Sequence, residues 1–154
     1  VDKRIDVFIT AITFQANVED LFHLDLAYAP PFSTAKDPVM YTGMILDNAI
    51  HRGRPLMTAH ELDTLMQSGE KYSLIDARAD AQFEKDHIET AESIPHAQLR
   101  AAAESLDKDA VAITYCNKGT TGNAAQNILI NQGFKQVLNL SGGHKQYSEI
   151  HNKK

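Results

Sequence analysis

The chain has 154 residues, 43% of them hydrophobic and 23% charged, a composition typical of a globular protein with one or two small domains. The formal net charge of -5, and the lack of any apolar run near the roughly 20 residues that cross a bilayer, argue against nucleic-acid and membrane partners. A single cysteine excludes an internal disulfide and favours a reducing, cytoplasmic location. Because the first residue is Val1 rather than Met, we expect the chain to begin inside a longer protein.

The first 54 residues predict helices and an extended connector, without a sheet of their own. Ile and Phe recur at helical spacing over residues 5–12, although the β-branched content leaves a strand as an alternative. Asn17, followed by Glu19 and Asp20, is typical of a helix N-cap with an acidic first turn.

Further along this half, two prolines require an extended chain over Tyr28–Phe32. Asp37 and Pro38 then predict an N-cap and first helical residue, opening a helix that runs to about Ile50. Fifty-odd residues of this kind would struggle to close a core alone. We therefore expect a dimer or domain interface over the apolar stretch formed by Phe22, Leu24, Leu26 and Phe32.

Gly53 and Pro55 interrupt any helix at the middle of the chain, which predicts two domains, residues 1–54 and 55–154. In the second domain, Thr58 and Glu61 form a capping box, and Gly69 ends the helix that they open. Strand-like and helix-like segments then alternate, which predicts an α/β fold with a parallel sheet covered by helices on both faces. We expect strands at residues 72–76, 93–95, 111–115 and 136–140. We expect a helical turn through Phe83, helices over residues 98–106 and about 122–132, and a last helix after Gly143.

The only cysteine, Cys116, lies where the apolar strand 111–115 ends and a Gly- and Thr-rich turn begins. A free thiol, with a pKa of about 8.5, needs help to ionise at neutral pH. Gly119 and Gly122 permit a turn whose amides converge on the sulfur near a helix N-terminus. The alternative is a small buried hydrophobe at a strand end, which needs no such turn. We expect the sulfur or an anion on it to be bound by Asn117, Lys118, Gly119, Thr120, Thr121 and Gly122.

Three blocks of the second half together resemble the rhodanese family: LIDARADAQFEKDHIETAESIPHAQL (residues 74–99), YCNKGTTG (115–122) and VLNLSGGHKQY (137–147). The resemblance implies a rhodanese-like fold and a sulfurtransferase. In that reaction the catalytic cysteine takes a sulfane sulfur from a donor, carries it as a persulfide and passes it to a thiol acceptor. The positions that match the family pattern are Asp76, Arg78, Phe83, His87, Ile88, Ala91, Cys116, Gly119, Gly142 and Gly143.

The pattern also departs from the family. Many members have an arginine five residues after the cysteine, where this chain has Thr121. Without this arginine the loop binds a dianion such as thiosulfate more weakly, although Lys118 can partly supply the missing positive charge. We therefore expect a natural sulfur donor other than thiosulfate. Tyr147 stands where the family often has tryptophan, and Asp86 where it has glycine.

The first half, through DKRIDVFITAI (residues 2–12) and LDLAYAPPFSTAKDP (24–38), resembles the C-terminal end of the dimerisation domain of FAD-dependent pyridine nucleotide-disulfide reductases. Coenzyme A-disulfide reductases and NADH-dependent persulfide reductases are the nearest class, and some carry a rhodanese domain at this place. The resemblance implies a homodimer with upstream reductase domains that use FAD, NAD(P)H and coenzyme A. The chain has no Gly-x-Gly-x-x-Gly loop, so we expect this fragment itself to bind no cofactor.

Other polar residues are given structural roles. Asp76 and Arg78 are expected to support the cysteine loop as an ion pair rather than to act in catalysis. We interpret His87 as a packed, hydrogen-bonded residue. His144 is interpreted as a solvated residue at a helix start, with a place at the rim of the active site as the alternative. The seven histidines show no ligand spacing, so we expect no metal site.

Two other functions remain to be compared with sulfur transfer. A docking or regulatory module would keep the fold with an inert Cys116, and alkylation of the thiol separates it from an enzyme. A cysteine phosphatase or arsenate reductase needs an arginine six residues after the cysteine, a position occupied here by Gly122.

Overall fold

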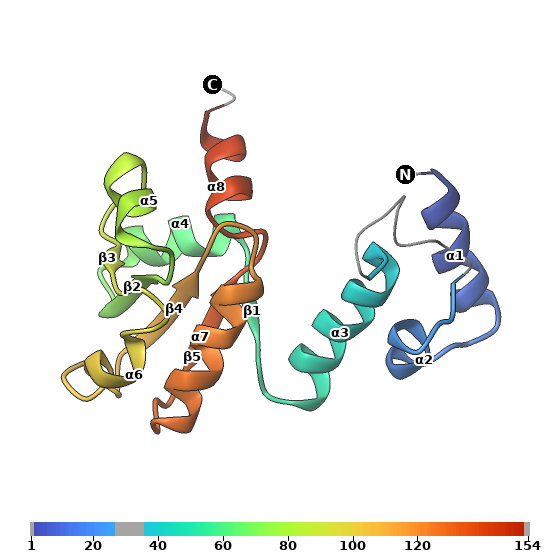
Figure 1. Cartoon of the computed structure of the whole chain (residues 1–154), viewed down its shortest axis with the longest axis horizontal. Helices are drawn as coiled ribbons and strands as arrows, with labels where there is room; N and C mark the ends of the chain where they lie inside the picture. Colours follow the sequence, from blue (N-terminus) through green and yellow to red (C-terminus); the bar gives the residue numbers. More distant parts are fainter. Residues whose placement is uncertain (1, 27–35, 153–154) are drawn as a thin grey trace. The chain divides into compact units, whose positions relative to one another are not determined.

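The computed structural model describes residues 2–26 and 36–152, and the chain divides into two compact units, Val1–Gly53 and Arg54–Lys154. The extended segment expected at residues 28–32 lies outside the described residues. The described part of the first unit consists of helices α1 (Asp2–Thr13), α2 (Val18–Phe22) and α3 (Pro38–His51) (Figure 1). Residues 5–12 are therefore helical rather than a strand.

Short polar contacts define the helix ends of the first unit. The amide of Asn17 donates to Asp20 over 2.7 Å in a capping box, and Asp37 accepts from the amide of Val39 over 3.0 Å. Arg4 on α1 pairs with the same Asp37 at 3.0 Å, which ties α1 to the start of α3. These contacts confirm the predicted caps at Asn17 and Asp37.

The first unit buries little apolar surface. In its described residues, Leu21 and Val39 are the buried hydrophobic side chains. Apart from Ile150, every large apolar side chain that is exposed in the described chain belongs to this unit. They lie on α1 or just after it (Ile5, Ile9, Ile12, Phe14) and on α3 (Tyr41, Ile45, Leu46, Ile50).

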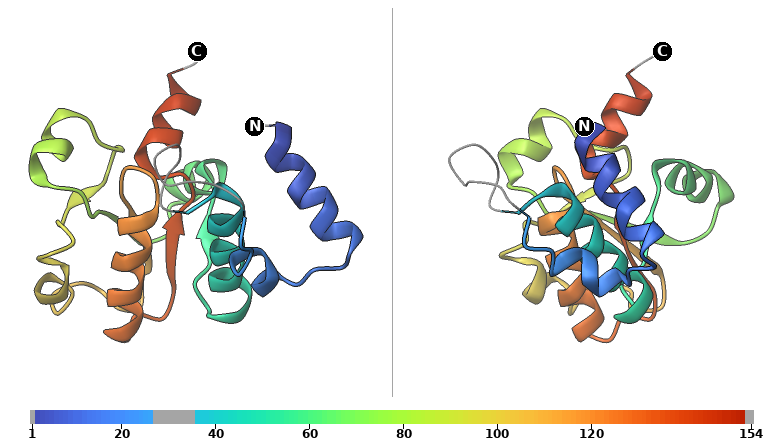
Figure 2. Two further views of the ribbon diagram at one scale, coloured as in Figure 1. Left: turned by 45° about the vertical axis from the view of Figure 1, so that its right-hand side comes forward. Right: turned by 90° about the vertical axis from the view of Figure 1, so that its right-hand side faces the viewer.

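The described part of the second unit contains a five-stranded parallel sheet in the order β1-β5-β4-β2-β3. Figure 2 shows the helices arranged around this sheet. The strands are β1 (Leu56–Met57), β2 (Tyr72–Asp76), β3 (Glu92–Ser93), β4 (Val111–Tyr115) and β5 (Val137–Leu140). The helices are α4 (Ala59–Ser68), α5 (Asp80–Lys85), α6 (Leu99–Ala102), α7 (Thr120–Asn131) and α8 (Gly143–His151).

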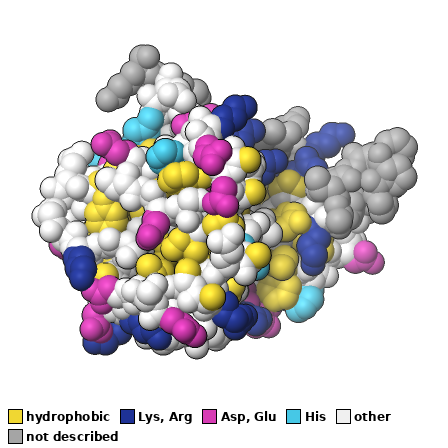
Figure 3. Space-filling view, turned by 60° about the vertical axis from the view of Figure 1, so that its left-hand side comes forward, with side chains coloured by type: hydrophobic (Ala, Val, Ile, Leu, Met, Phe, Trp, Pro, Cys, Tyr) yellow, Lys and Arg dark blue, Asp and Glu magenta, His cyan; other side chains and the backbone are white. Residues whose placement is uncertain are grey.

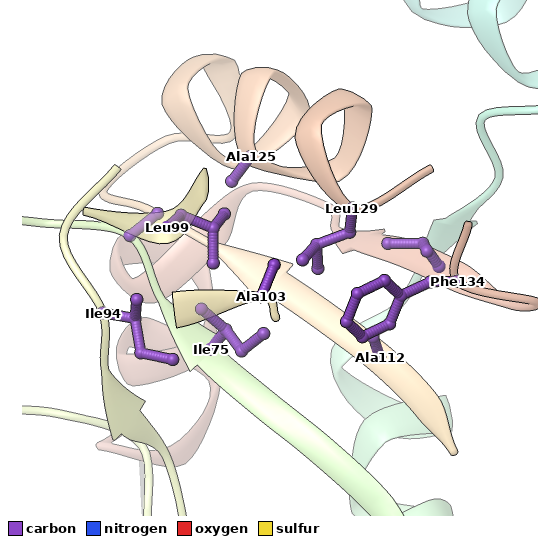
Figure 4. Packing of buried hydrophobic residues seen from close by; sticks show 10 residues of the cluster. Ile75, Ile94, Leu99, Ala103, Ala112, Ala125, Leu129 and Phe134 are labelled. Carbon is purple, nitrogen blue, oxygen red and sulfur yellow. The ribbon is translucent and has the colours of Figure 1, made fainter. Parts of the chain in front are cut away.

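Alternate residues of β2, β4 and β5 supply two cores, one on each face of the sheet. Figure 4 shows one of them, in which Ile75 and Ala112 from the sheet meet Ala125 and Leu129 from α7. The opposite face packs against α4 and α8, and its cluster contains Leu62, Leu74, Ile113, Tyr115 and Leu140. The predicted α/β fold, with helices on both faces of a parallel sheet, is thus confirmed.

Several element boundaries differ from those expected. Helix α6 stops at Ala102, and the chain then tightens into a turn in which the amides of Glu104 and Ser105 donate to carbonyls three residues back. Helix α7 begins at Thr120 rather than near residue 122, since Gly119 adopts a φ of 110° and acts as the N-cap. Strand β3 ends at Ser93, two residues before Pro95, whose carbonyl accepts from the amides of Gln98 and Leu99 and so opens the turn that leads to α6.

The surface carries charges of both signs. On the face shown in Figure 3, acidic and basic side chains are interspersed with apolar ones. In residues 2–26 and 36–152, no helix has the length and apolar character to cross a membrane.

Candidate functional site

Cys116 follows β4, the central strand of the sheet. Ligands of open parallel sheets bind at the carboxyl ends of the strands, and the sulfur lies at that edge. The residue is only 6% exposed, so water stabilises a thiolate there poorly and the protein has to supply the donors.

The turn after Cys116 brings a main-chain donor to the sulfur. The amide nitrogen of Gly119 lies 3.2 Å from the Cys116 sulfur. Gly119 has a φ of 110°, which favours glycine, and α7 starts at the next residue. A helix N-terminus carries a partial positive charge, so this placement favours a negative sulfur.

The side chains around this turn face solvent. Asn117, Lys118, Thr120 and Thr121 are exposed, whereas Gly122 is buried. Of the predicted loop residues, Gly119 therefore contacts the sulfur through its amide, and the exposed side chains of Lys118, Thr120 and Thr121 follow in the same turn.

The start of α8 holds the cysteine loop from a second side. The amide of His144 donates to the Cys116 carbonyl over 2.8 Å, and that of Lys145 donates to the Asn117 carbonyl over 3.1 Å. Gly143 makes this approach feasible: its φ is 60°, and a Cβ there would lie 2.2 Å from the Cys116 carbonyl oxygen.

Two strands of the sheet hold the cysteine loop through side-chain hydrogen bonds. The side-chain nitrogen of Asn139 on β5 donates to the Gly119 carbonyl over 3.2 Å. The hydroxyl of Thr114 on β4 donates to the Gly122 carbonyl over 2.9 Å. Gly122 lies so close to the sheet that a Cβ on it would come within 2.3 Å of Asn139 Oδ1.

Asp76 and Arg78 form the expected ion pair and are both buried. The guanidinium donates to both oxygens of Asp76 over 2.7–3.0 Å, and a further bond of 2.7 Å reaches the Asp86 carbonyl. Burial acts to lower the pKa of Arg78, but the hydrogen bond and charge of Asp76 prevail and raise it. Arg78 also lies over the Tyr115 ring at 5.6 Å, so the pair braces the strand that leads to Cys116.

His144 is buried, so the interpretation of it as a solvated residue was wrong. Its ring stacks on Tyr115 with centroids 6.3 Å apart, and its Nε2 lies 3.4 Å from an Asp86 oxygen. Burial lowers the pKa of His144, and the charge of Arg78 adds to that effect. Burial also raises the pKa of the Tyr115 hydroxyl, with Asp76 contributing.

His87 accords with its prediction as a hydrogen-bonded residue: Nδ1 lies 2.9 Å from the Phe83 carbonyl oxygen and the two rings stack at 3.9 Å, although the side chain is exposed. Among the described residues, one group of possible metal ligands, Glu19, Asp47 and His51, occurs in the first unit. Its buried carboxylate, Asp47, is already paired with His51 and Arg52.

Thr114 and Asn139 were not among the predicted site residues. Their signal in the sequence is a polar residue inside an otherwise apolar strand, in VAITY and VLNL. Because a buried polar group needs a hydrogen-bond partner, such residues indicate a nearby main-chain target, although the strand pattern cannot say which one.

A family model described as the rhodanese-like domain matches residues 58–150. The chain is 27% identical over 117 residues to the probable adenylyltransferase/sulfurtransferase MoeZ of Mycobacterium tuberculosis, a match covering 74% of this chain and 30% of MoeZ. It is 31% identical over 78 residues to the thiosulfate sulfurtransferase GlpE of Coxiella burnetii, covering 51% of this chain and 73% of GlpE.

Two solved structures resemble nearly the whole chain. One is reduced CoADR-RHD of Bacillus anthracis, with a TM-score of 0.88 and 35% identity. The other is a NAD-dependent persulfide reductase from A. fulgidus, with a TM-score of 0.76 and 30% identity. They cover 99% and 94% of this chain, but this chain spans only 27% and 25% of theirs.

Proposed function

The chain belongs to the rhodanese-like domain family, and on that premise we propose that Cys116 is the catalytic residue of a sulfurtransferase and carries sulfur as a persulfide. One observation carries the proposal most strongly: the Gly119 amide lies 3.2 Å from a buried sulfur at the start of a helix. A cysteine that only packs in the core needs no main-chain hydrogen-bond donor, whereas a thiolate in a site without water depends on such a donor.

The transfer takes two displacements on sulfur. The Cys116 thiolate attacks the outer sulfur of a donor persulfide, forms a new S–S bond and expels the donor thiolate. An acceptor thiolate then attacks the outer sulfur of the Cys116 persulfide, which regenerates the Cys116 thiolate. Each step breaks one sulfur–sulfur bond and makes another, so neither step needs an outside oxidant or reductant.

The loop limits which donors fit. A dianion such as thiosulfate would rely on Lys118 alone for side-chain charge within the loop, because Thr121 is neutral. An organic persulfide carries one charge on its sulfur, so its binding needs less positive charge than that of thiosulfate. The same amides and hydroxyls of the loop can bind it. We therefore assign an organic persulfide, rather than thiosulfate, as the donor class.

The same proposal places this chain in a longer reductase. CoADR-RHD and the persulfide reductase resemble both units, and the apolar side chains exposed on α1 and α3 would suit an upstream domain and a second subunit. Residues 1–54 would then belong to its dimerisation domain, and a cytoplasmic location would keep Cys116 reduced. The chain lacks a Gly-x-Gly-x-x-Gly loop, so FAD and NAD(P)H would bind outside it, and no residue here is assigned to coenzyme A.

Sulfur transfer from an organic persulfide to a thiol, followed with and without the Cys116→Ala change, tests the proposal. Transfer by the wild type and its loss in the variant would support it, whereas equal transfer by both would refute it. The alternative of an inert docking module is tested by iodoacetamide, which an activated Cys116 should accept well below about pH 8.

A further inference from the structure

We propose that Thr114 and Asn139 are positioning residues that hold the first turn of α7 so that the Gly119 amide faces the Cys116 sulfur. The inference rests on the proposed function of Cys116 and adds two residues to its site. Neither side chain is placed in contact with the reacting sulfur; both act through the main chain of α7.

The two residues form one unit on the sheet. Thr114 on β4 and Asn139 on β5 are register partners, and both lie on the face that packs against α7. Thr114 is fully buried and Asn139 is 4% exposed. Each has a donor directed at one carbonyl at the start of the helix. The Asn139 side-chain nitrogen donates to Gly119 over 3.2 Å, and the Thr114 hydroxyl lies 2.9 Å from the Gly122 carbonyl oxygen, closer than the 3.3 Å to that of Leu138.

These bonds fix the direction of the neighbouring amides. In a helix the carbonyls point toward the C-terminus and the amides toward the N-terminus. Anchoring the carbonyls of Gly119 and Gly122 to the sheet therefore sets both the tilt and the rotation of the first turn. The Gly119 carbonyl also accepts from the Asn123 amide over 2.8 Å, so Asn139 reinforces the bond that opens the helix.

Burying the Asn139 side chain costs free energy, and packing alone does not explain why an amide occupies this position. Asn139 Oδ1 is buried and has no hydrogen-bond partner among the described residues. An unpaired buried acceptor is unfavourable, and an apolar side chain of similar size would avoid it. The bond from the Asn139 side-chain nitrogen to Gly119 is the feature that such a replacement would lose.

Gly122 leaves the space that Asn139 uses. A Cβ on Gly122 would lie 2.3 Å from Asn139 Oδ1, 3.2 Å from the Tyr115 Cα and 3.3 Å from the Cys116 nitrogen. A side chain at this position would push Asn139 away from Gly119 and press on the main chain at the cysteine. Gly122 and Asn139 thus depend on each other to keep the loop in place.

The test uses the full chain and the rate of Cys116 alkylation by iodoacetamide between about pH 6 and pH 9, where thiols ionise. Thr114→Val removes the hydroxyl with little change of shape, and Thr114→Ser is its matched control. Asn139→Leu removes the amide with similar volume. We expect Thr114→Val and Asn139→Leu to move the midpoint of the pH–rate profile upward and to slow alkylation at pH 7 roughly three- to tenfold, as losing one hydrogen bond would. Thr114→Ser should behave as the wild type does.

An unchanged midpoint in both variants would overturn the inference, as would a uniform fall in rate at every pH, which a merely structural role would give. Should Asn139→Leu fail to fold, the contrast between Thr114→Val and Thr114→Ser decides the matter. Alkylation needs no sulfur donor, so the result stands apart from the proposed function. If wild-type Cys116 never accepts sulfur, the proposed function fails whatever the pH profiles show.

Discussion

The amide nitrogen of Gly119 lies 3.2 Å from the sulfur of Cys116, a residue that is only 6% exposed. Two features hold this geometry: the start of α8 binds the carbonyl of Cys116, and the sheet binds the carbonyls at the start of α7. The reactivity of the thiol should therefore depend on residues that never touch it.

Gly143→Ala should disrupt the cysteine loop. The new Cβ would lie 2.2 Å from the Cys116 carbonyl oxygen, at a φ of 60°. Gly133→Ala is the control, because Gly133 has a φ of 86° but no atom within 4 Å of its Cβ position. Both variants should lose roughly 1–2 kcal/mol of stability through strain, but only Gly143→Ala should also lose most sulfur transfer. Equal activity in the two variants would contradict the role given to Gly143.

Removing one partner of the Asp76–Arg78 pair should destabilise the second unit strongly. Arg78→Met leaves the buried Asp76 carboxylate without its guanidinium, a change that typically costs about 3–5 kcal/mol. Urea unfolding measures the loss. Lys135→Met breaks the exposed pair between Lys135 and Asp109 and should barely move the midpoint. A similar midpoint for both variants would show that the buried pair is not a brace.

Thr121→Arg should improve the use of thiosulfate. Thr121 is exposed in the first turn of α7, so a guanidinium there can reach a dianion near the sulfur. One charge-assisted hydrogen bond, worth about 1.5 kcal/mol, would lower the KM for thiosulfate roughly tenfold. Thr121→Gln supplies the length without the charge, and high salt should reduce the gain. A KM that stays the same in Thr121→Arg would remove our reason for disfavouring thiosulfate.

His144 should make the protein less stable in acid. Burial, followed by the charge of Arg78, lowers the pKa of His144 in the folded state, so the unfolded chain binds a proton more readily. Its contribution to stability is therefore full above the unfolded pKa of about 6.5 and is lost as the pH falls below that value. Wild type and His144→Asn should be compared by thermal unfolding at several pH values. The wild type should lose more stability on acidification; parallel curves would show that His144 does not titrate differently on folding.

Local patterns were enough to predict the architecture. The Thr58–Glu61 capping box is present, with a bond of 2.7 Å from the Thr58 amide to Glu61. The apolar run at residues 111–115 forms the central strand, as its β-branched content indicated. Such signals depend on neighbouring residues alone, which is why the sequence reveals them.

Features that depend on distant partners were missed. The short strand β1 exists because it pairs with β5, and nothing local distinguishes Leu56 and Met57. His144 is buried because its ring meets Tyr115 from another element, which the glycines before it do not reveal. The catalytic role of Cys116 and the binding role of residues 117–122 remain predictions.

The most direct test of the account is the intact mass of the reduced 154-residue chain after brief exposure to an organic persulfide and removal of the excess. We predict a gain of one sulfur atom, mapped to Cys116, reversed by a thiol acceptor and absent from Cys116→Ala. A wild-type mass that does not change, while the thiol remains free and the fold intact, would contradict sulfur carriage by this residue.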